Sequence, residues 1–547
     1  MSPDSTDNSA GAPDRPAAGP VVRTEAMGHK VGGGMTWMTA SAVVTRFATF
    51  LAQILLGKLL FPEDFAIYGT ATAIAGFLMV CRDLATGSII VQRGRENYEQ
   101  NAGIAFWLGF TYDMAVVVLT LLLAWPIARL CGAMDLAPML VVMALTLPFG
   151  AVANVLYSKL RLELKFKAFS AITTISGFLR QVSMVLFAWA GFGHMSFAWP
   201  ALVCIVVDCI CLWWYTGDAV WMRSPRVSQW SGWIRDAFWL MFTSLANFAM
   251  DWGPYLVLAP LMGGKNPVIG YYFFAYQITG QIGVMLAFSS AVVLTPAFQK
   301  LNAEPRRQSD AALRALRTLM LGGCVASLGL ASIIGPLEHL LWHGKYADSV
   351  GALMILGAFY PWRITFGLTS SLLTAQGAFR RLTALSVFEC VGLMVAAGIA
   401  GIYHPTATGI AWWTGAWVLI SRLVATLYTF WKMGEPTSRI LRAVVPSWCV
   451  CLIAFAAATQ VAGLFDFASF TQRLLAGLLP AWLEARAADL VCIGVYGTVC
   501  AMVMALLARL VLHADLRDAI SVAPSRLREP LRRLLFLRND PPADQSL

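Results

Sequence analysis

Apolar stretches long enough to cross a bilayer alternate with short polar loops along most of the chain. About fourteen of them approach or exceed the roughly 20 residues that a membrane-spanning helix needs. Helices are the expected spanning element, because backbone amides in lipid need hydrogen-bond partners within their own segment. The pattern therefore predicts an all-α polytopic membrane protein. The expected spans are 36–60, 66–91, 103–130, 137–158, 169–191, 195–216, 237–261, 267–297, 315–336, 348–375, 382–402, 407–431, 440–463 and 487–511.

The loops between these spans alternate in charge. Numbered from the N-terminal tail, the odd loops contain few basic residues beyond Lys265, Lys345, Arg473 and Arg486. Cationic loops resist translocation, so the even loops and both termini are expected to face the cytoplasm. The basic residues of the even loops are Arg93 and Arg95, those in 159–167, 223–235 and 300–317, Arg380 and Arg381, and those in 432–442.

Composition supports the same class. The 547 residues are 58% hydrophobic and 13% charged, whereas a soluble protein has about 25% charged residues. The net charge of +10 lies in short loops beside apolar helices, so anionic membrane lipids, and not nucleic acid, are the expected partner. The eleven cysteines are scattered through apolar runs and are interpreted as small buried hydrophobic residues.

Motifs for catalysis and for cofactors are missing from the sequence. It has no GxxxxGK[ST] phosphate loop and no GxSxG nucleophile elbow. His339 and His343 are four residues apart beside Glu338, but no third ligand or second shell is evident, which argues against a metal site. We therefore expect a protein that is not an enzyme and that needs no cofactor.

A faint internal repeat suggests two lobes. Residues 59–68 join the first two spans and resemble residues 261–272, which join the seventh and eighth. Aligning Ala66 with Gly270 gives an offset of 204 residues (270 minus 66), with six spans between the copies. An even number of spans gives both copies one orientation, so two pseudo-symmetric six-helix lobes with substrate between them are expected. The expected division is a disordered cytoplasmic tail at 1–34, an N-terminal lobe at 35–223, a C-terminal lobe at 224–435, two additional helices at 436–512, and a basic amphipathic cytoplasmic tail at 513–547.

Charged residues within the expected spans are the main functional candidates. Each costs at least roughly 2.5–3.5 kcal/mol near the bilayer centre, so it persists only when paired or hydrated. Guanidinium groups suit an anionic head group such as a pyrophosphate, while carboxylates could bind a counter-ion or a proton. The candidate arginines are Arg46, Arg82, Arg180, Arg363 and Arg422, and the candidate carboxylates are Asp83, Asp251 and Glu389.

Structural ion pairs between helices are the alternative explanation for these charges. Arg46 aligns with Met250 in the repeat, so Arg46 and Asp251 have matched depths and could pair across a central cavity. Arg422 could instead extend its guanidinium to the membrane surface.

Polar and aromatic residues add to the expected cavity. The membrane-embedded amides are Asn247, Gln277, Gln281 and Gln376. The aromatic residues of 271–276 could stack on sugar rings, although an interfacial tyrosine belt is the commoner explanation.

Several short motifs resemble the Wzx-type polysaccharide-export flippases of the multidrug/oligosaccharidyl-lipid/polysaccharide exporter superfamily. They cover roughly residues 36 to 435. The chain departs from the family pattern at Ala66, where a glycine is usual, and at 252–254, where a basic residue is frequent. The motifs are Phe61-Pro62-Glu63-Asp64-Phe65, Asp83-Leu84-Ala85-Thr86-Gly87, Val91-Gln92-Arg93, Ala105-Phe106-Trp107-Leu108, Leu162-Glu163-Leu164-Lys165-Phe166-Lys167, Gly191-Phe192-Gly193, Asn247 with Asp251, Gly270-Tyr271-Tyr272 and Pro296-Ala297-Phe298.

The resemblance implies two six-helix lobes arranged as a V, with two extra C-terminal helices, in a bacterial inner membrane. It implies a protein that moves undecaprenyl-pyrophosphate-linked oligosaccharide to the periplasmic leaflet by alternating access, for exopolysaccharide or lipopolysaccharide synthesis. A single chain is sufficient for such a carrier, so a monomer is expected. Arg46 and Arg82 are the best-placed pyrophosphate contacts, and other polysaccharide synthesis or export proteins are candidate partners. The alternatives are an ion-coupled multidrug or metabolite antiporter of the same superfamily and, ranked lower, a membrane polysaccharide polymerase or ligase.

Overall fold

The computed structural model describes residues 41, 44–82, 87, 89–90, 97–163, 165–465, 467–475 and 480–511. All regular structure in these residues is helical, in agreement with the predicted fold class. A helix at 44–59 precedes the labelled helices. These are α2 (Pro62–Arg82), α4 (Tyr98–Leu130), α5 (Leu136–Leu145), α6 (Leu147–Leu162), α7 (Phe166–Trp189), α8 (Ala198–Thr216), α9 (Trp230–Met262), α10 (Pro267–Lys300), α11 (Pro305–Trp342), α12 (Ala347–Phe359), α13 (Pro361–Ala375), α14 (Phe379–Tyr403), α15 (Ala407–Trp431), α16 (Thr437–Leu464), α17 (Phe467–Leu475) and α18 (Ala481–Val511).

Nine helical segments of the described chain are long and apolar enough to cross a membrane, and ten if the bent pair α12–α13 counts as one span. The pair bends by 41° at Tyr360, where Pro361 starts α13 and leaves the preceding turn without one backbone donor. The other four expected spans coincide with the helix at 44–59 and with α2, α9 and α10. The protein is thus a multi-pass helical membrane protein. Both predicted tails lie outside the described residues.

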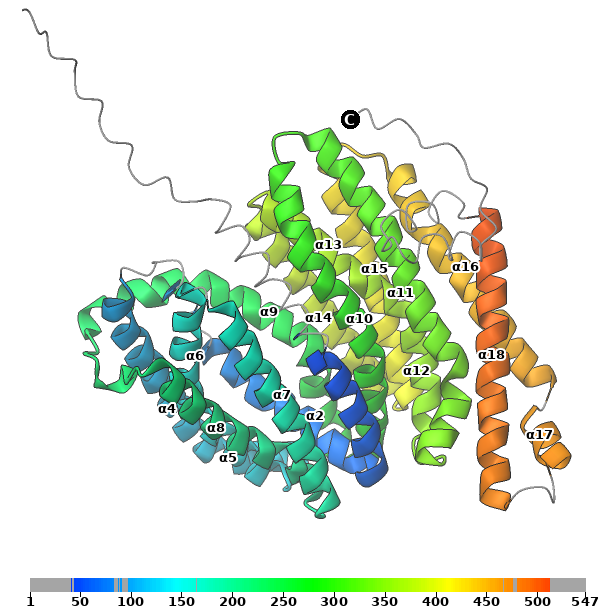
Figure 1. Cartoon of the computed structure of the whole chain (residues 1–547), viewed down its shortest axis with the longest axis horizontal. Helices are drawn as coiled ribbons and strands as arrows, with labels where there is room; N and C mark the ends of the chain where they lie inside the picture. Colours follow the sequence, from blue (N-terminus) through cyan, green and yellow to red (C-terminus); the bar gives the residue numbers. More distant parts are fainter. Residues whose placement is uncertain are drawn as a thin grey trace, which may run out of the picture.

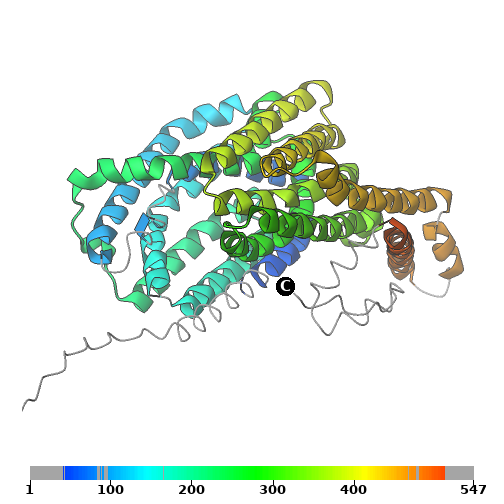
Figure 2. The same cartoon turned by 90° about the horizontal axis from the view of Figure 1, so that it is seen from above.

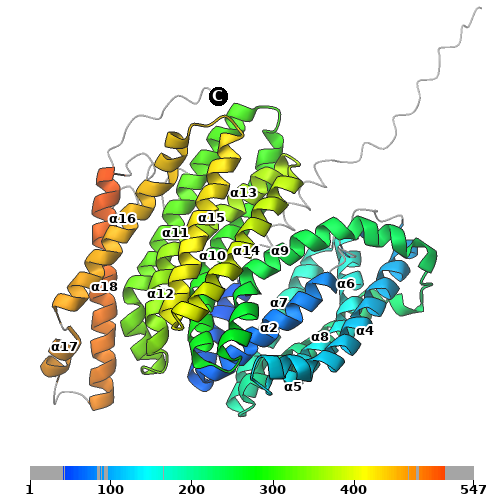
Figure 3. The same cartoon turned by 180° about the vertical axis from the view of Figure 1, so that it is seen from behind.

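The helices form two groups that meet along α2 and α9 (Figure 1). Helices α4 to α8 make up the first group, and α10 to α15 make up the second. Helices α16 and α18 lie along the outer edge of the second group, with the short α17 beside them, as Figures 2 and 3 show from two other sides. The division into two six-helix lobes and the bounds of those lobes stay a prediction.

Helix α9 connects the two groups because its ends are buried in different cores. Near its start, Trp233 is buried with Leu212 and Val220 of the first group. Near its end, Tyr255 is buried with Phe273 of α10 in the core where the groups meet. A 33-residue helix is about 50 Å long, which is enough to reach from one group to the other.

Aromatic side chains join the groups at the odd-loop end. Phe65 of α2 packs edge-to-face on Phe197, with ring centroids 5.6 Å apart, and on Phe274 of α10 at 5.7 Å. Tyr346 stacks on Phe274 at 4.0 Å. Phe273 and Phe274 are fully buried, so these residues form core packing. The expectation that they form an interfacial belt or a sugar-stacking surface is wrong for them.

Hydrogen bonds to the helix at 44–59 and its C-terminal end reinforce this contact. Tyr346 Oη donates to the carbonyl of Leu60 at 2.8 Å, and Trp342 Nε1 donates to the carbonyl of Ile54 at 3.1 Å. Gly270 also packs here, where a Cβ would lie 1.8 Å from the carbonyl oxygen of Pro62. The two groups are therefore packed tightly against each other on the odd-loop side.

The two additional helices pack on the second group through small buried residues. Cys451 and Ala454 of α16 and Cys500 of α18 lie in one core with Cys324 and Leu328 of α11. Small side chains let helix backbones approach closely where lipid gives no hydrophobic drive for association.

Candidate functional site: two arginine–carboxylate pairs in the second helix group

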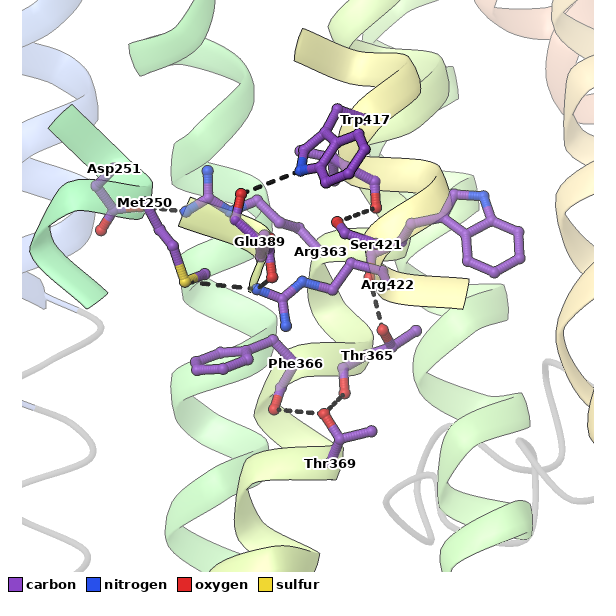
Figure 4. Close-up of polar contacts among 12 residues, drawn as sticks. Met250, Asp251, Arg363, Thr365, Phe366, Thr369, Glu389, Trp417, Ser421 and Arg422 are labelled. Carbon is purple, nitrogen blue, oxygen red and sulfur yellow. Dashed lines mark hydrogen bonds and ion pairs between the residues drawn. The ribbon is translucent and has the colours of Figure 1, made fainter. Parts of the chain in front are cut away.

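Four charged residues, one each on α9, α13, α14 and α15, form two adjacent ion pairs. Arg363 is in the first turn of α13, directly after the bend at Tyr360. Its guanidinium pairs with Asp251 of α9, and Arg422 of α15 pairs with Glu389 of α14. Figure 4 shows both pairs side by side.

The first pair is embedded in tyrosine hydroxyls. Arg363 Nη1 donates to Tyr276 Oη at 2.7 Å, and Tyr276 Oη donates to Asp251 Oδ1 at 3.1 Å. The guanidinium also lies 5.6 Å from the ring centre of Tyr276 and 5.5 Å from that of Tyr360, within range of cation–π attraction. The Arg363 side chain is 17% exposed, whereas that of Asp251 is 52% exposed. The carboxylate is the accessible member of this pair.

The second pair is enclosed. The side chains of Arg422 and Glu389 are each only 3% exposed. The Arg422 guanidinium lies 4.3 Å from the ring centre of Phe366, and Nη2 is 3.8 Å from Met250 Sδ. A buried charge persists when a partner compensates its lost hydration, and each of these residues is the compensating partner of the other.

Residues of α9 contact both pairs. Met250, which touches Arg422, directly precedes Asp251, which binds Arg363 (Figure 4). Asn247 lies one turn earlier on the same face as Asp251, since residues four apart are neighbours on a helix. Its Oδ1 is buried without a hydrogen-bond partner among the described residues. A rotation or shift of α9 would therefore act on both pairs together.

A small pocket adjoins Arg363. It is bounded by Tyr272, Tyr276, Tyr360 and Arg363 on one side and by Leu393 and Thr414 on the other. Its free volume is about 10 Å³, near the minimum for a single water molecule. No pyrophosphate fits there in this conformation, so an anion can reach Arg363 only by displacing Asp251 or after the helices separate.

The structure corrects two expectations about these charges. Asp251 of α9 pairs with Arg363 of α13, so its expected pairing with Arg46 is wrong. Equal depth in the membrane does not fix the direction in which a side chain points. Arg422 does not extend to a surface, since it is buried and paired with Glu389.

The remaining predicted residues are not gathered at this site. Arg46 and Arg180 are exposed, and Gln277 is half-buried. Gln376, at the end of α13, donates to Gln308 at 3.1 Å, away from the two pairs. Asp83 and the side chains of Arg82 and Gln281 lie outside the described residues.

Two features of the structure were not expected from the sequence: the tyrosines that bind Arg363 and a second polar cluster. Tyr276 and Tyr360 bind Arg363, but the sequence named only Tyr276, as one of the aromatic residues of 271–276. On the even-loop side, Asp218 accepts from Lys159 at 3.0 Å, from Arg223 at 2.9 Å and from Tyr98 at 3.0 Å. The cluster ties the connection between α8 and α9 to α4 and α6.

The histidine pair has other partners. His339 Nδ1 lies 2.8 Å from Asp489 Oδ2 of α18, and Glu338 accepts from the backbone N–H of Tyr346 at 2.8 Å. Among the described residues, no group of three or more His, Cys, Asp or Glu is placed to hold a metal ion.

Comparison with known proteins gives the family. The model of the family described as "Polysaccharide biosynthesis protein" matches residues 55–351, more than half of the chain. The chain therefore belongs to the polysaccharide biosynthesis protein family, which is a family of membrane transporters and not of enzymes. The family resemblance noted in the sequence is confirmed.

Two relatives have names that describe their roles. The succinoglycan biosynthesis transport protein ExoT of Rhizobium meliloti is 24% identical over 341 residues, which are 62% of this chain and 67% of the relative. The lipopolysaccharide biosynthesis protein WzxC of Escherichia coli is 22% identical over 423 residues, which are 75% of this chain and 82% of the relative.

Solved structures share the fold. The lipid II flippase MurJ, in an inward closed conformation, aligns with a TM-score of 0.64 at 14% identity, covering 86% of this chain and 98% of that one. An inward-facing multidrug resistance MATE transporter of the MOP superfamily aligns with a TM-score of 0.59 at 17% identity, covering 71% and 94%. At these identities the likeness concerns the fold alone.

Proposed function

We propose that this protein is a flippase for undecaprenyl-pyrophosphate-linked oligosaccharide repeat units. It moves them from the cytoplasmic to the periplasmic leaflet of a bacterial inner membrane, by alternating access, for exopolysaccharide or lipopolysaccharide synthesis. In this proposal the chain crosses the membrane fourteen times and has both termini in the cytoplasm. It is divided into lobes at 35–223 and 224–435 and two extra helices at 436–512.

The physical difficulty in this task is hydration. A sugar pyrophosphate cannot enter hydrocarbon unaided, because its hydroxyls and charges lose their hydrogen bonds to water. The protein has to supply substitute donors inside the membrane while the lipid tail stays in the apolar phase. Arginine is suited to this, since its guanidinium stays charged and binds phosphate oxygens with two parallel hydrogen bonds.

The observation that carries the proposal is the exposed carboxylate of Asp251, which is paired with Arg363. Arg363 is itself mostly buried, but its partner Asp251 is 52% exposed. An incoming pyrophosphate could take the place of the Asp251 carboxylate on the guanidinium, since both are oxygen anions. In the empty carrier, Asp251 would neutralise Arg363, and Asn247 would offer the sugar a free amide oxygen. Glu389 would keep Arg422 neutralised until α9 moves.

The tight contact on the odd-loop side also supports alternating access. Phe65, Phe274 and Tyr346 pack there between the two helix groups. A carrier closed at its outer end would receive the head group from the even-loop side, which is the expected cytoplasmic face.

An ion-coupled antiporter of small cations is the second candidate. It would need a carboxylate free to bind a cation. The two carboxylates of the candidate site, Asp251 and Glu389, are instead paired with arginines, which favours an anionic substrate.

The test is complementation of a strain that lacks the protein. Arg363→Gln should abolish surface polysaccharide and cause lipid-linked repeat units to accumulate on the cytoplasmic face, with normal membrane insertion. The matched control is Arg380→Gln, an exposed arginine at the start of α14. Repeat units accumulating on the periplasmic face would point to a polymerase or ligase. Unchanged polysaccharide in the deletion strain would refute the proposal and favour the antiporter.

A further inference from the structure

A long apolar groove runs between α14 and α15 on the exposed face of the second group. Its volume is about 700 Å³, and only Val, Ile, Phe, Trp, Ala and Gly side chains line it. Val395 at its edge is 55% exposed and Trp413 is 40% exposed. The groove therefore opens toward the surrounding lipid and away from the two ion pairs.

Small residues on its floor and aromatic residues on its walls give the groove its depth. A Cβ at Gly392 would lie 1.9 Å from the Trp417 indole, so only glycine lets this ring lie against α14. The ring is fixed by a hydrogen bond from Trp417 Nε1 to the carbonyl of Glu389 at 3.0 Å. Ala396 and Ala416 continue the floor. The groove is therefore formed by specific packing of α14 against α15.

The length of the groove indicates what it holds. Its lining extends along α14 from Val387 to Ile399, a rise of about 18 Å. It passes Val391, the midpoint of α14. The hydrocarbon core is about 30 Å thick, so one leaflet offers about 15 Å. A chain that fills the groove thus extends across the middle of the membrane, which suits a long polyprenyl chain better than the acyl chain of a phospholipid confined to one leaflet.

We propose that this groove binds the polyprenyl tail of the substrate while the head group moves through the protein. The inference rests on the proposed function. The same two helices carry both sites: Leu393 and Thr414 face the pocket beside Arg363, and Glu389 links the two faces. Its carbonyl holds Trp417, and its carboxylate holds Arg422. Head group and tail would thus be bound on opposite faces of one helix pair, at adjoining heights.

The test is photolabelling of the full chain in bilayer discs of phosphatidylethanolamine and phosphatidylglycerol. The probe is a polyprenyl pyrophosphate with a diazirine on its tail, and labelled peptides are mapped by mass spectrometry. We expect labelling on the groove residues of α14 and α15 that unlabelled polyprenyl pyrophosphate displaces. Val395→Trp, which fills the groove from its open edge, should remove most of it. Val424→Trp should keep it, because Val424 is an exposed α15 residue outside the groove, 43% exposed.

The other outcomes separate this inference from the function on which it rests. Displaceable labelling elsewhere on the protein would overturn the groove assignment and leave the flippase proposal standing. No displaceable labelling at all would count against both. Equal labelling of the groove by a diazirine phospholipid, unaffected by polyprenyl pyrophosphate, would make it a site for ordinary lipid. The wild-type map answers the question even if a variant fails to fold.

Discussion

Arg422 and Glu389 show how a charged residue can be both costly and necessary inside a membrane protein. Each side chain is 3% exposed, and the guanidinium also contacts Phe366. Removing one partner leaves the other as an uncompensated buried charge, while removing both leaves none. The pair should therefore contribute to stability mainly through the penalty for breaking it.

Substituting one residue of this pair should destabilise the protein more than substituting both. Glu389→Leu or Arg422→Met alone should lower the free energy of unfolding by about 3–5 kcal/mol. The double variant should recover much of that loss. Thermal unfolding in detergent measures the effect, with the exposed Arg380→Met as control. A double variant as unstable as the worse single variant would show that the pair is not an isolated unit.

Asp251 should act as an internal competitor for the anionic head group. Asp251→Asn removes the negative charge from Arg363 with little change in shape. A charge-assisted hydrogen bond contributes about 1.5–3 kcal/mol, so polyprenyl pyrophosphate should bind about tenfold more tightly or better. Binding to the purified protein in bilayer discs measures this, with Asp135→Asn at the exposed Lys265 pair as control. Unchanged or weaker binding in Asp251→Asn would argue against the exchange of carboxylate for phosphate.

At the scale of elements, the Asp218 cluster holds the start of α9 to the first helix group. Asp218 receives hydrogen bonds from Lys159 and Arg223, whose side chains come from α6 and from the connection after α8. Burial alone would raise the pKa of the Asp218 carboxyl, but the hydrogen bond from Lys159 and the charges of Arg223 and Lys159 outweigh it and lower this pKa below its ordinary value.

Acid should loosen this attachment. Because the folded-state pKa of Asp218 lies below that of the unfolded chain, its contribution is fully present above the unfolded pKa of about 3.9. It is lost as the pH falls through the lower folded value. Melting temperatures between pH 3 and pH 7 should thus fall more steeply below pH 4 for the native chain than for Asp218→Asn. Parallel curves for the two proteins would remove Asp218 as the cause, and Asp135→Asn provides the matched control.

At the scale of the whole molecule, the two helix groups touch through their odd-loop turns. The backbone N–H of Gly264, in the turn before α10, donates to the carbonyl of Cys131, in the turn after α4, at 2.6 Å. A Cβ on Gly264 would lie 3.4 Å from the Cβ of Cys131, close to the separation of about 3.5–4.5 Å found in disulfides. The native cysteine is therefore placed to report on whether this end opens.

A cross-link here should stop transport. Gly264→Cys should form a disulfide with Cys131 under oxidising conditions, which holds the groups together on the odd-loop side. Export should fall to background and return after reduction, measured as surface polysaccharide or as transport in vesicles. The control is Gly264→Cys with Cys131→Ser, which cannot cross-link. Full export by the cross-linked protein would refute alternating access through this end.

Hydropathy and short motifs were enough to predict the class of the protein and the positions of its helices. Hydropathy is a sum over neighbouring residues, so it predicts where a span lies without knowledge of its neighbours. Most predicted spans coincide with one helix, and two coincide with a pair of consecutive helices, α5–α6 and α12–α13. The motifs shared with the flippases likewise pointed to the family that residues 55–351 confirm. Both signals come from residues that are close together in the sequence, so they can be recognised without knowledge of how the helices pack.

Which charged residues form pairs could be learned only from the packing of the helices. Asp251 and Arg363 are 112 residues apart, and the repeat alignment gave the height of Asp251 but not the face of α9 on which it lies. Membrane helices can rotate about their axes at little cost in hydrophobic burial, because lipid and helix faces are similarly apolar. Close packing of small residues and rings, such as Gly392 against Trp417, sets the rotation. That packing brings Asp251 to Arg363 and Glu389 to Arg422, and it leaves Arg46 outside both pairs.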